Sequence, residues 1–404
     1  MQTNSDTPIL ISRIGSSIAD AEQVPCITFR FQVDSRSYDL YVKSHSLVEQ
    51  PGLDAAIPLA ILPAMRLRKA IHVNGAVSRT FIDGVKRAMR FYATSFEGFS
   101  EVPITADSCY EARPGPSQRR ASFFSGGVDS FFTLLKGRNE LTDIITIRGF
   151  DMSLGDADRW EKTRASAHAV AAELGIRFHE LESNFGSMIK EFGLWIEHGH
   201  GLALACAARS LAGLFAEIRI PGTFSSDGQI PWGSSAFSDP EFSDERLAII
   251  HDTCAATRTD KIEFLAQQPL ALQYLRVCPG VKNDANYNCC RCEKCLRTMV
   301  SLYACGALER AAAFPLPLTP ELVSRTLVLT DAVKAFTDEN IRLLQRYRPE
   351  NDEMLKALRI QRDRPLWLAR LLAKTSRKRR HLRSNLRRIL DRAVGLRRRD
   401  GPAG

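Results

Sequence analysis

One run of ten residues constrains this chain more than any other segment: Ala121–Ser130, which reads Ala-Ser-Phe-Phe-Ser-Gly-Gly-Val-Asp-Ser. Its first four residues fit a short buried strand, and apolar residues recur at helical spacing directly after Ser130. Gly126 and Gly127 between them permit a tight turn and the close approach of a ligand. The first amides of a helix have no intrahelical partner and attract anions. The run therefore predicts a phosphate-binding turn between a strand and a helix.

Polar side chains in the same run suit that role. Ser125 and Ser130 would donate hydroxyl hydrogen bonds to phosphate, and Asp129 would hold Mg²⁺ or cap the helix. The turn is not of the Walker type, because no Gly-Lys-Ser or Gly-Lys-Thr sequence follows it. A plain strand-to-helix turn, with Ser and Asp as caps, is the alternative interpretation.

Strand and helix patterns alternate through residues 119–310. The strand-like segments are 121–124, 144–147, 178–181 and 218–220, and the helix-like segments between them are 130–135, 159–174 and 201–214. This alternation is typical of an α/β fold with a doubly wound, mostly parallel sheet. Ligands of such sheets bind at the carboxyl ends of the strands, so we expect the functional site at that edge.

The segment before this alternation predicts a small α+β module over residues 1–118. Apolar and polar residues alternate over 26–42 around a polar turn, which is typical of a β-hairpin with one buried face. Residues 53–70 are apolar and helix-prone, although Pro58 and Pro63 would interrupt a helix there. At 404 residues the chain has room for two or three domains in all.

The C-terminal part is predicted to be a helical extension over residues 311–373, followed by a basic tail over 374–404. The tail holds twelve Lys or Arg and two Asp, a net charge of +10, so the other 373 residues sum to −1 within the total of +9. Apolar residues recur in the tail at helical spacing, which predicts a basic amphipathic helix that contacts RNA or an anionic membrane surface. A solvated C-terminus is the alternative.

The sequence contains no recognisable export or membrane-insertion pattern. Its N-terminus is polar, and no run of about 18 apolar residues occurs. Ten cysteines in 404 residues are too few for a disulfide scaffold. We therefore expect a cytoplasmic protein that is not transmembrane.

Half of these cysteines fall close together, and four of them have metal-ligand spacing: Cys278, Cys289, Cys292 and Cys295. C-x2-C spacing lets two sulfurs converge on one ion, and four thiolates close a tetrahedral, structural Zn²⁺ site. Cys290 could replace Cys289, but the regular spacing of two residues favours Cys289. An iron–sulfur cluster and a set of buried or redox-active thiols are the alternatives.

A polar, glycine-bearing loop follows the strand-like segment 218–220, at the strand end where a substrate should lie. Two cationic residues further along the chain would neutralise phosphates opposite the glycine turn. An ordinary surface loop and a solvated helix face are the alternatives. His198 and His200 are candidates for a general base, although capping or core histidines fit their positions too. The candidates for substrate contacts are Asp227, Trp232, Ser234, Asp239, Arg258 and Lys261.

The run SGGVDS matches the SGGxDS signature of the PP-loop ATP pyrophosphatase superfamily, which the chain resembles over roughly residues 119–300. The resemblance implies a HUP-like α/β fold in which the glycine turn binds the pyrophosphate end of ATP. It also implies that a carboxylate or carbonyl oxygen is adenylated and then attacked by ammonia, an amine or a sulfur donor. The residues that it assigns to ATP and Mg²⁺ are Ser125, Gly126, Gly127, Asp129 and Ser130, with Asp129 and Ser130 in catalysis and the backbone near Ile147 and Gly149 against adenine.

The cysteine run followed by Leu296-Arg297 also resembles the 7-cyano-7-deazaguanine synthase family, within a wider bacterial group that shares the run Cys289–Met299. The first cysteine spacer and the flanking segments are longer here than in that family. The resemblance therefore implies the reaction class and a structural zinc ion, but not the same substrate. The sequence thus predicts an ATP-dependent adenylating enzyme that releases AMP and pyrophosphate and activates a small-molecule acceptor for amide, nitrile or thio-group formation. A tRNA thiolation or modification enzyme and a non-catalytic nucleotide-binding zinc scaffold are the alternatives.

Overall fold

The computed structural model describes residues 7–19, 24–47, 51–225, 230–252, 255–280 and 287–375. The chain divides into two compact units, one made of residues 1–288 with 310–313 and the other of 289–309 with 314–404. Each unit buries a hydrophobic cluster of its own. No helix in the described ranges is both long and apolar enough to cross a membrane.

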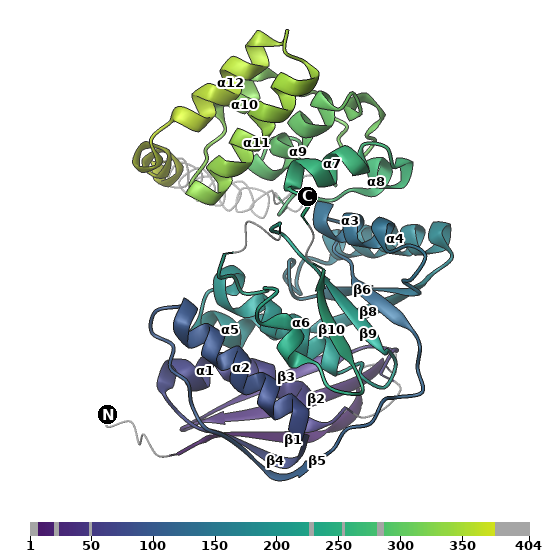
Figure 1. The fold of residues 1–404 in the computed structure, drawn as a ribbon, viewed down its shortest axis with the longest axis vertical. Helices are drawn as coiled ribbons and strands as arrows, with labels where there is room; N and C mark the ends of the chain where they lie inside the picture. Colours follow the sequence, from purple (N-terminus) through teal and green to yellow (C-terminus); the bar gives the residue numbers. More distant parts are fainter. Residues whose placement is uncertain are drawn as a thin grey trace, which may run out of the picture. The chain divides into compact units, whose positions relative to one another are not determined.

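One ten-stranded sheet runs through the described part of the first unit, in the order β10-β9-β6-β7-β8-β3-β2-β1-β4-β5 (Figure 1). Six of its nine neighbouring pairs are parallel, which confirms the predicted α/β class with a mostly parallel sheet. The strands are β1 (Ile9–Ala19), β2 (Val24–Val33), β3 (Arg36–Lys43), β4 (Ile71–Ser78), β5 (Ile104–Tyr110), β6 (Arg120–Phe123), β7 (Asp143–Arg148), β8 (Arg177–Ser183), β9 (Glu217–Pro221) and β10 (Ala248–Asp252).

The five strands from β6 to β10 are all parallel to one another, and β6 to β9 carry the predicted alternation. The chain steps outward from β6 to β7 and β8, then returns to the other side of β6 to add β9 and β10. The carboxyl ends of β6 and β9 therefore flank a topological switch point, where open parallel sheets bind ligands. The helices after these strands are α3 (Val128–Lys136), α4 (Ala157–Leu174), α5 (Gly186–Phe192), α6 (His200–Arg209), α7 (Arg258–Leu265) and α8 (Pro269–Tyr274).

Strands β1 to β5 form the other half of the same sheet. The predicted hairpin is confirmed, since β2 and β3 pair antiparallel around a tight turn that begins after Val33. α1 (Ile57–Leu67) and α2 (Arg79–Ser95) pack on this half of the sheet (Figure 1). The expected break at Pro63 is wrong, because α1 continues through that residue. Pro58 lies in the first turn of α1, where a missing amide costs nothing.

The two halves of the sheet join where β3 pairs antiparallel with β8, at Val42 with Ser183 and at Lys43 with Glu182. Next to this seam a polar cluster is buried, centred on Asp143, which is 0% exposed. Asp143 contacts His179 Nε2 at 2.8 Å and accepts hydrogen bonds from the guanidinium of Arg119. His179 Nδ1 lies 2.6 Å from the hydroxyl of Ser46, which follows β3.

The second unit is helical, and its helices are α9 (Glu293–Ala304), α10 (Pro320–Arg325), α11 (Asp331–Tyr347) and α12 (Asp352–Asp363), followed by a helical segment over 366–375. Threonine or asparagine caps three of them, because Thr319, Thr330 and Asn351 accept hydrogen bonds from amides in the following turn. Val300, Leu344 and Leu358 are among the residues that fill the core.

The buried cluster at the seam makes a prediction about stability. Burial of Asp143 favours its protonated form, but hydrogen bonds from His179, Arg119 and Thr142 and the charge of Arg119 outweigh it, and they lower the pKa of Asp143 to about 2. The carboxylate therefore stabilises the fold above its ordinary pKa of 3.8, and this contribution is lost as the pH falls toward 2. We expect Asp143→Asn to lower the free energy of unfolding by about 2 kcal/mol at neutral pH.

Urea unfolding followed by circular dichroism, at neutral pH and near pH 3, measures this effect. The difference between wild type and Asp143→Asn should shrink at the lower pH. Asp39→Asn is the matched control, because its pair with Arg30 is 45% exposed on each side and is screened by water. Equal losses in the two variants at neutral pH would contradict the role assigned to Asp143.

Candidate functional site

The glycine turn lies directly after β6 and leads into α3. Gly126 has φ +75°, a conformation that glycine adopts without the steric cost of a Cβ atom. Arg276 holds the turn from outside, since its amide donates to the Gly126 carbonyl at 2.7 Å and its Nε donates to the Ser125 carbonyl at 3.0 Å. The turn is thus fixed by a residue about 150 positions later, and within the turn the Gly127 amide donates to Ser125 Oγ at 3.3 Å.

The helix after the turn begins without a side-chain cap. Gly127 occupies the N-cap position, and no side chain in the described part of the protein makes a capping hydrogen bond there. Ser130 Oγ instead donates to the Gly127 carbonyl at 3.0 Å, and it lies 3.5 Å from Ser125 Oγ. The two predicted hydroxyls therefore lie together at an uncapped helix N-terminus, where backbone amides attract an anion.

A buried lysine reaches this helix N-terminus from α7. The Lys261 side chain is 2% exposed, and its Nζ donates to Asp129 Oδ1 at 2.9 Å and to the Gly222 carbonyl at 2.6 Å. Thr257 and Asp260 form a capping box that starts α7 and fixes the position of this lysine. The alternative of a solvated helix face is wrong for Lys261, which is buried beside Asp129, and its predicted contact with phosphates stays a prediction. Arg258 opens the same helix and is half-buried.

The remaining candidates for substrate contacts lie on the loop after β9, and their surroundings differ. Asp227 lies outside the described residues. Trp232 is half-buried and meets Phe224 edge-on, with ring centroids 5.6 Å apart. Ser234 and Asp239 are 9% and 0% exposed, and Ser234 Oγ donates to Asp239 Oδ2 at 2.6 Å. These two side chains belong to a buried network within the loop.

That network holds a histidine which sequence reasoning missed. His251 lies near the carboxyl end of β10, and its Nδ1 is 2.8 Å from Asp239 Oδ2. A carboxylate on Nδ1 holds the proton there and leaves the lone pair on Nε2. Nε2 faces Gly222, since a Cβ atom added to that glycine would lie 3.0 Å from it. His251 therefore lies beside the residue whose carbonyl accepts the Lys261 hydrogen bond.

The other two histidine candidates are structural. His198 packs edge-on against Phe96 and Phe99, and its Nδ1 accepts a hydrogen bond from the Leu194 amide at 3.0 Å. Burial lowers the pKa of His198, and it also lowers the pKa of His200. Both residues fit the alternative of capping or core histidines.

The end of β7, expected near adenine, carries Ile147 and Gly149. Ile147 is 8% exposed, and Gly149 has φ +100°. A Cβ atom on Gly149 would lie 1.9 Å from the Ser183 carbonyl oxygen, so packing against the end of β8 already requires glycine there. Gly149 is thus explained by the fold, whether or not a ligand contacts it.

The four predicted cysteine ligands come together in space. The sulfurs of Cys278, Cys289, Cys292 and Cys295 all lie within 4.8 Å of one another, and three of these side chains are buried. Cys289 Sγ and Cys295 Sγ are 3.9 Å apart. Tetrahedral Zn²⁺ with bonds of about 2.3 Å places its sulfurs about 3.8 Å apart, so the spacing fits zinc. Cys290 is not a member of the group and adopts a left-handed backbone, with φ +52°.

Backbone amides and one asparagine support these sulfurs. The Gly280 amide donates to Cys278 Sγ and the Cys292 amide to Cys289 Sγ, each at 3.3 Å, as is usual for thiolate ligands. Asn288 is 0% exposed, and its Oδ1 accepts from the amides of Val277 and Cys278 at 3.0 and 3.2 Å. Its Nδ2 donates to the carbonyls of Leu275 and Ala313. Asn288 thus fixes the backbone that carries the first cysteine.

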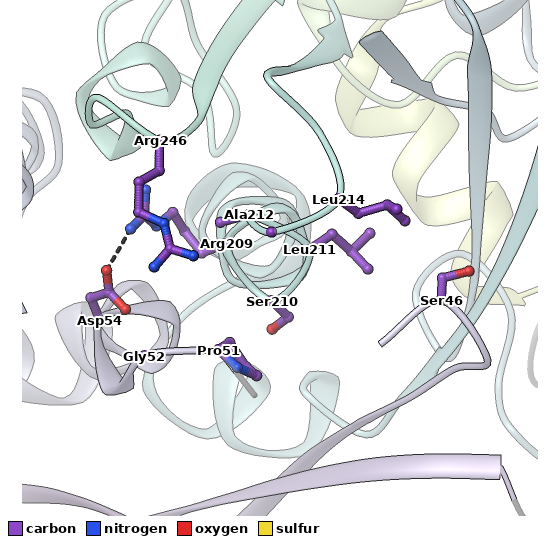
Figure 2. A pocket seen from close by; sticks show the side chains of 11 residues that line it. Ser46, Pro51, Gly52, Asp54, Arg209, Ser210, Leu211, Ala212, Leu214 and Arg246 are labelled. Atoms are coloured by element: carbon purple, nitrogen blue, oxygen red, sulfur yellow. Dashed lines mark hydrogen bonds and ion pairs between the residues drawn. The ribbon is translucent and has the colours of Figure 1, made fainter. Parts of the chain in front are cut away.

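A separate hollow lies at the end of α6 and contains none of the predicted site residues (Figure 2). Arg209 is 2% exposed there and pairs with Asp54 and Asp244, while its guanidinium lies 4.5 Å from the centre of the Phe81 ring. Burial disfavours its charge, but the two carboxylates outweigh burial and raise the pKa of Arg209. Because its charge is already balanced by these carboxylates, Arg209 is explained as a structural ion network.

Comparison of this chain with protein-family models, with curated proteins and with solved structures finds no match. The SGGxDS resemblance and the activity that it implies therefore remain predictions.

The cysteine geometry makes a prediction about metal content. Cys289→Ser removes one of the four clustered sulfurs and should lose bound zinc, whereas Cys290→Ser removes a neighbour outside the cluster and should keep it. Elemental analysis by mass spectrometry, together with visible absorption, measures the content and identity of the metal. Equal zinc content in the two variants would contradict the assignment of Cys289, and iron with visible absorption would favour the iron–sulfur alternative.

Proposed function

We propose that this chain is an ATP-dependent adenylating enzyme that splits ATP into AMP and pyrophosphate and activates an acceptor oxygen. The observation that carries the proposal is the arrangement at the switch point, where an uncapped helix N-terminus adjoins Asp129 and the buried ammonium of Lys261. Oriented amides and a desolvated cation both stabilise negative charge and need no rearrangement when it develops.

In the first step, a carboxylate or carbonyl oxygen of the acceptor attacks the α-phosphorus of ATP. The bond from that phosphorus to the oxygen that bridges it to the β-phosphorus breaks, and pyrophosphate leaves. The amides at the start of α3 and the hydroxyls of Ser125 and Ser130 would bind the pyrophosphate oxygens, and Lys261 would offset their charge. Mg²⁺ held by Asp129 would supply Lewis-acid stabilisation of the phosphates.

In the second step, a nucleophile attacks the activated carbon and AMP leaves. The nucleophile must lose a proton, and His251 Nε2 would accept it, with Asp239 orienting the ring from Nδ1. His251 lies beside Gly222, and Gly222 accepts from the same lysine that holds Asp129. This chain of contacts supports one site for both steps.

The first test concerns nucleotide binding. Alanine at position 126 would have to keep φ near +75°, and a left-handed residue with a Cβ atom costs about 1 to 2 kcal/mol. We expect Gly126→Ala to weaken MgATP binding about tenfold or more in titration calorimetry. Gly115→Ala is the matched control, because a Cβ atom there meets nothing within 4 Å. Equal binding by both variants would exclude the turn as the phosphate site.

The second test concerns catalysis. Exchange of labelled pyrophosphate into ATP, in the presence of fractionated metabolite extracts, reports adenylation of an acceptor even when that acceptor has not been identified. We expect wild-type protein to exchange with at least one fraction and Asp129→Ala to lose that exchange. MgATP binding without exchange in any fraction would contradict the enzymatic proposal and leave the scaffold alternative.

A further inference from the structure

The last described helical segment, residues 366–375, exposes large apolar side chains on its outer face. Trp367 is 68% exposed, Leu371 is 51% exposed and Leu372 is 41% exposed. Trp367 and Leu371 are four residues apart and therefore lie on the same face of the helix. Ala369 is 0% exposed, so the buried side of the segment is occupied by a small residue while the larger ones face outward. We call Trp367, Leu371 and Leu372 the apolar stripe.

Contacts within the helical unit hold this segment in place. Arg364, just before it, donates to the carbonyls of Thr326 and Ser324 at 3.0 and 2.7 Å. Arg370 Nε donates to the carbonyl of Leu329 at 3.1 Å. The apolar stripe is therefore presented by a helix that is anchored within its own unit.

Positive charge accompanies the apolar stripe. Arg370 and Lys374 are exposed on the same segment, and Lys374 lies seven residues after Trp367, on the same face. The chain beyond residue 375 contains eleven more Lys or Arg and two Asp. Everything before residue 374 sums to −1, so the basic charge of the protein follows the apolar stripe directly in the sequence.

We propose that the apolar stripe, together with Arg370 and Lys374 on the same segment, forms a docking surface for an anionic lipid bilayer. A bilayer surface offers an apolar layer beneath negative headgroups, and both features match this end of the chain. Trp367 would lie at the headgroup level, the two leucines would enter the acyl boundary, and Arg370 and Lys374 would contact headgroup phosphates. An RNA strand would use the positive charge and would stack one base on Trp367, but the two leucines of the stripe offer further bases no stacking surface. This inference does not depend on the proposed enzymatic function.

Vesicle co-sedimentation of the full chain tests the proposal. Wild-type protein should bind vesicles of equimolar phosphatidylserine and phosphatidylcholine, bind phosphatidylcholine vesicles poorly, and lose affinity as salt is added. The triple variant Trp367→Ala, Leu371→Ala, Leu372→Ala keeps every charge and should bind the anionic vesicles about tenfold more weakly. A chain ending at residue 375 should bind more weakly and show a flatter salt dependence.

The matched control is the double variant Leu194→Ala, Ile196→Ala, which removes two side chains that are each 56% exposed in the other unit and should not alter vesicle binding. Three outcomes would overturn the proposal: equal binding to anionic and neutral vesicles, undiminished vesicle binding by the triple variant, or binding of an RNA oligonucleotide in place of vesicles. Sedimentation velocity without lipid tests a fourth outcome that would overturn the proposal. If the wild-type protein is a dimer and the triple variant is a monomer, the apolar stripe is covered by a second copy of the chain.

Discussion

The ammonium group of Lys261 is removed from water, and the arrangement of the site depends on how its charge is satisfied. A buried cation is tolerated only with a counter-charge and hydrogen-bond acceptors. Here Asp129 after β6 supplies the charge and the Gly222 carbonyl after β9 supplies a second acceptor. One side chain therefore ties together the strand ends on both sides of the switch point. Asp129, in the first turn of the helix after the glycine turn, is thus held by a partner 132 positions away.

Contacts between residues far apart in the sequence, such as that of Lys261 with Asp129, limit how much of the structure the sequence could predict. Hydrophobic periodicity is local, so the alternation of strands and helices after residue 119 and the hairpin before it could be predicted, as could the parallel class of the sheet. Strand β10, at the edge of the sheet, was missed. The break expected at Pro63 did not occur, because α1 is buried along nearly its whole length and packing outweighs one lost hydrogen bond.

The same distinction between local and long-range features applies to the candidate site. The glycine turn and the cysteine cluster were predictable, because their residues are close in sequence and their chemistry is recognisable there. The pair formed by Asp239 and His251 was not, since neither residue has a distinctive neighbourhood and the contact requires the loop after β9 to fold back on β10. Asp239 was predicted to contact a substrate; the packed structure shows it buried, with hydrogen-bond contacts to Ser234 and His251.

The continuity of the sheet gives the N-terminal strands a physical role. Without β3, strand β8 would be the edge of a parallel sheet and would present unpaired backbone groups. β3 covers that edge, although the two strands pair over a short stretch. Side chains extend the seam: the Tyr41 amide donates to Asn184 Oδ1 at 2.9 Å, and Ser44 Oγ donates to the Glu180 carbonyl at 2.6 Å. The buried carboxylate of Asp143 lies one strand further in, at the amino end of β7, so loosening the seam would expose the polar cluster that Asp143 forms with His179 and Arg119.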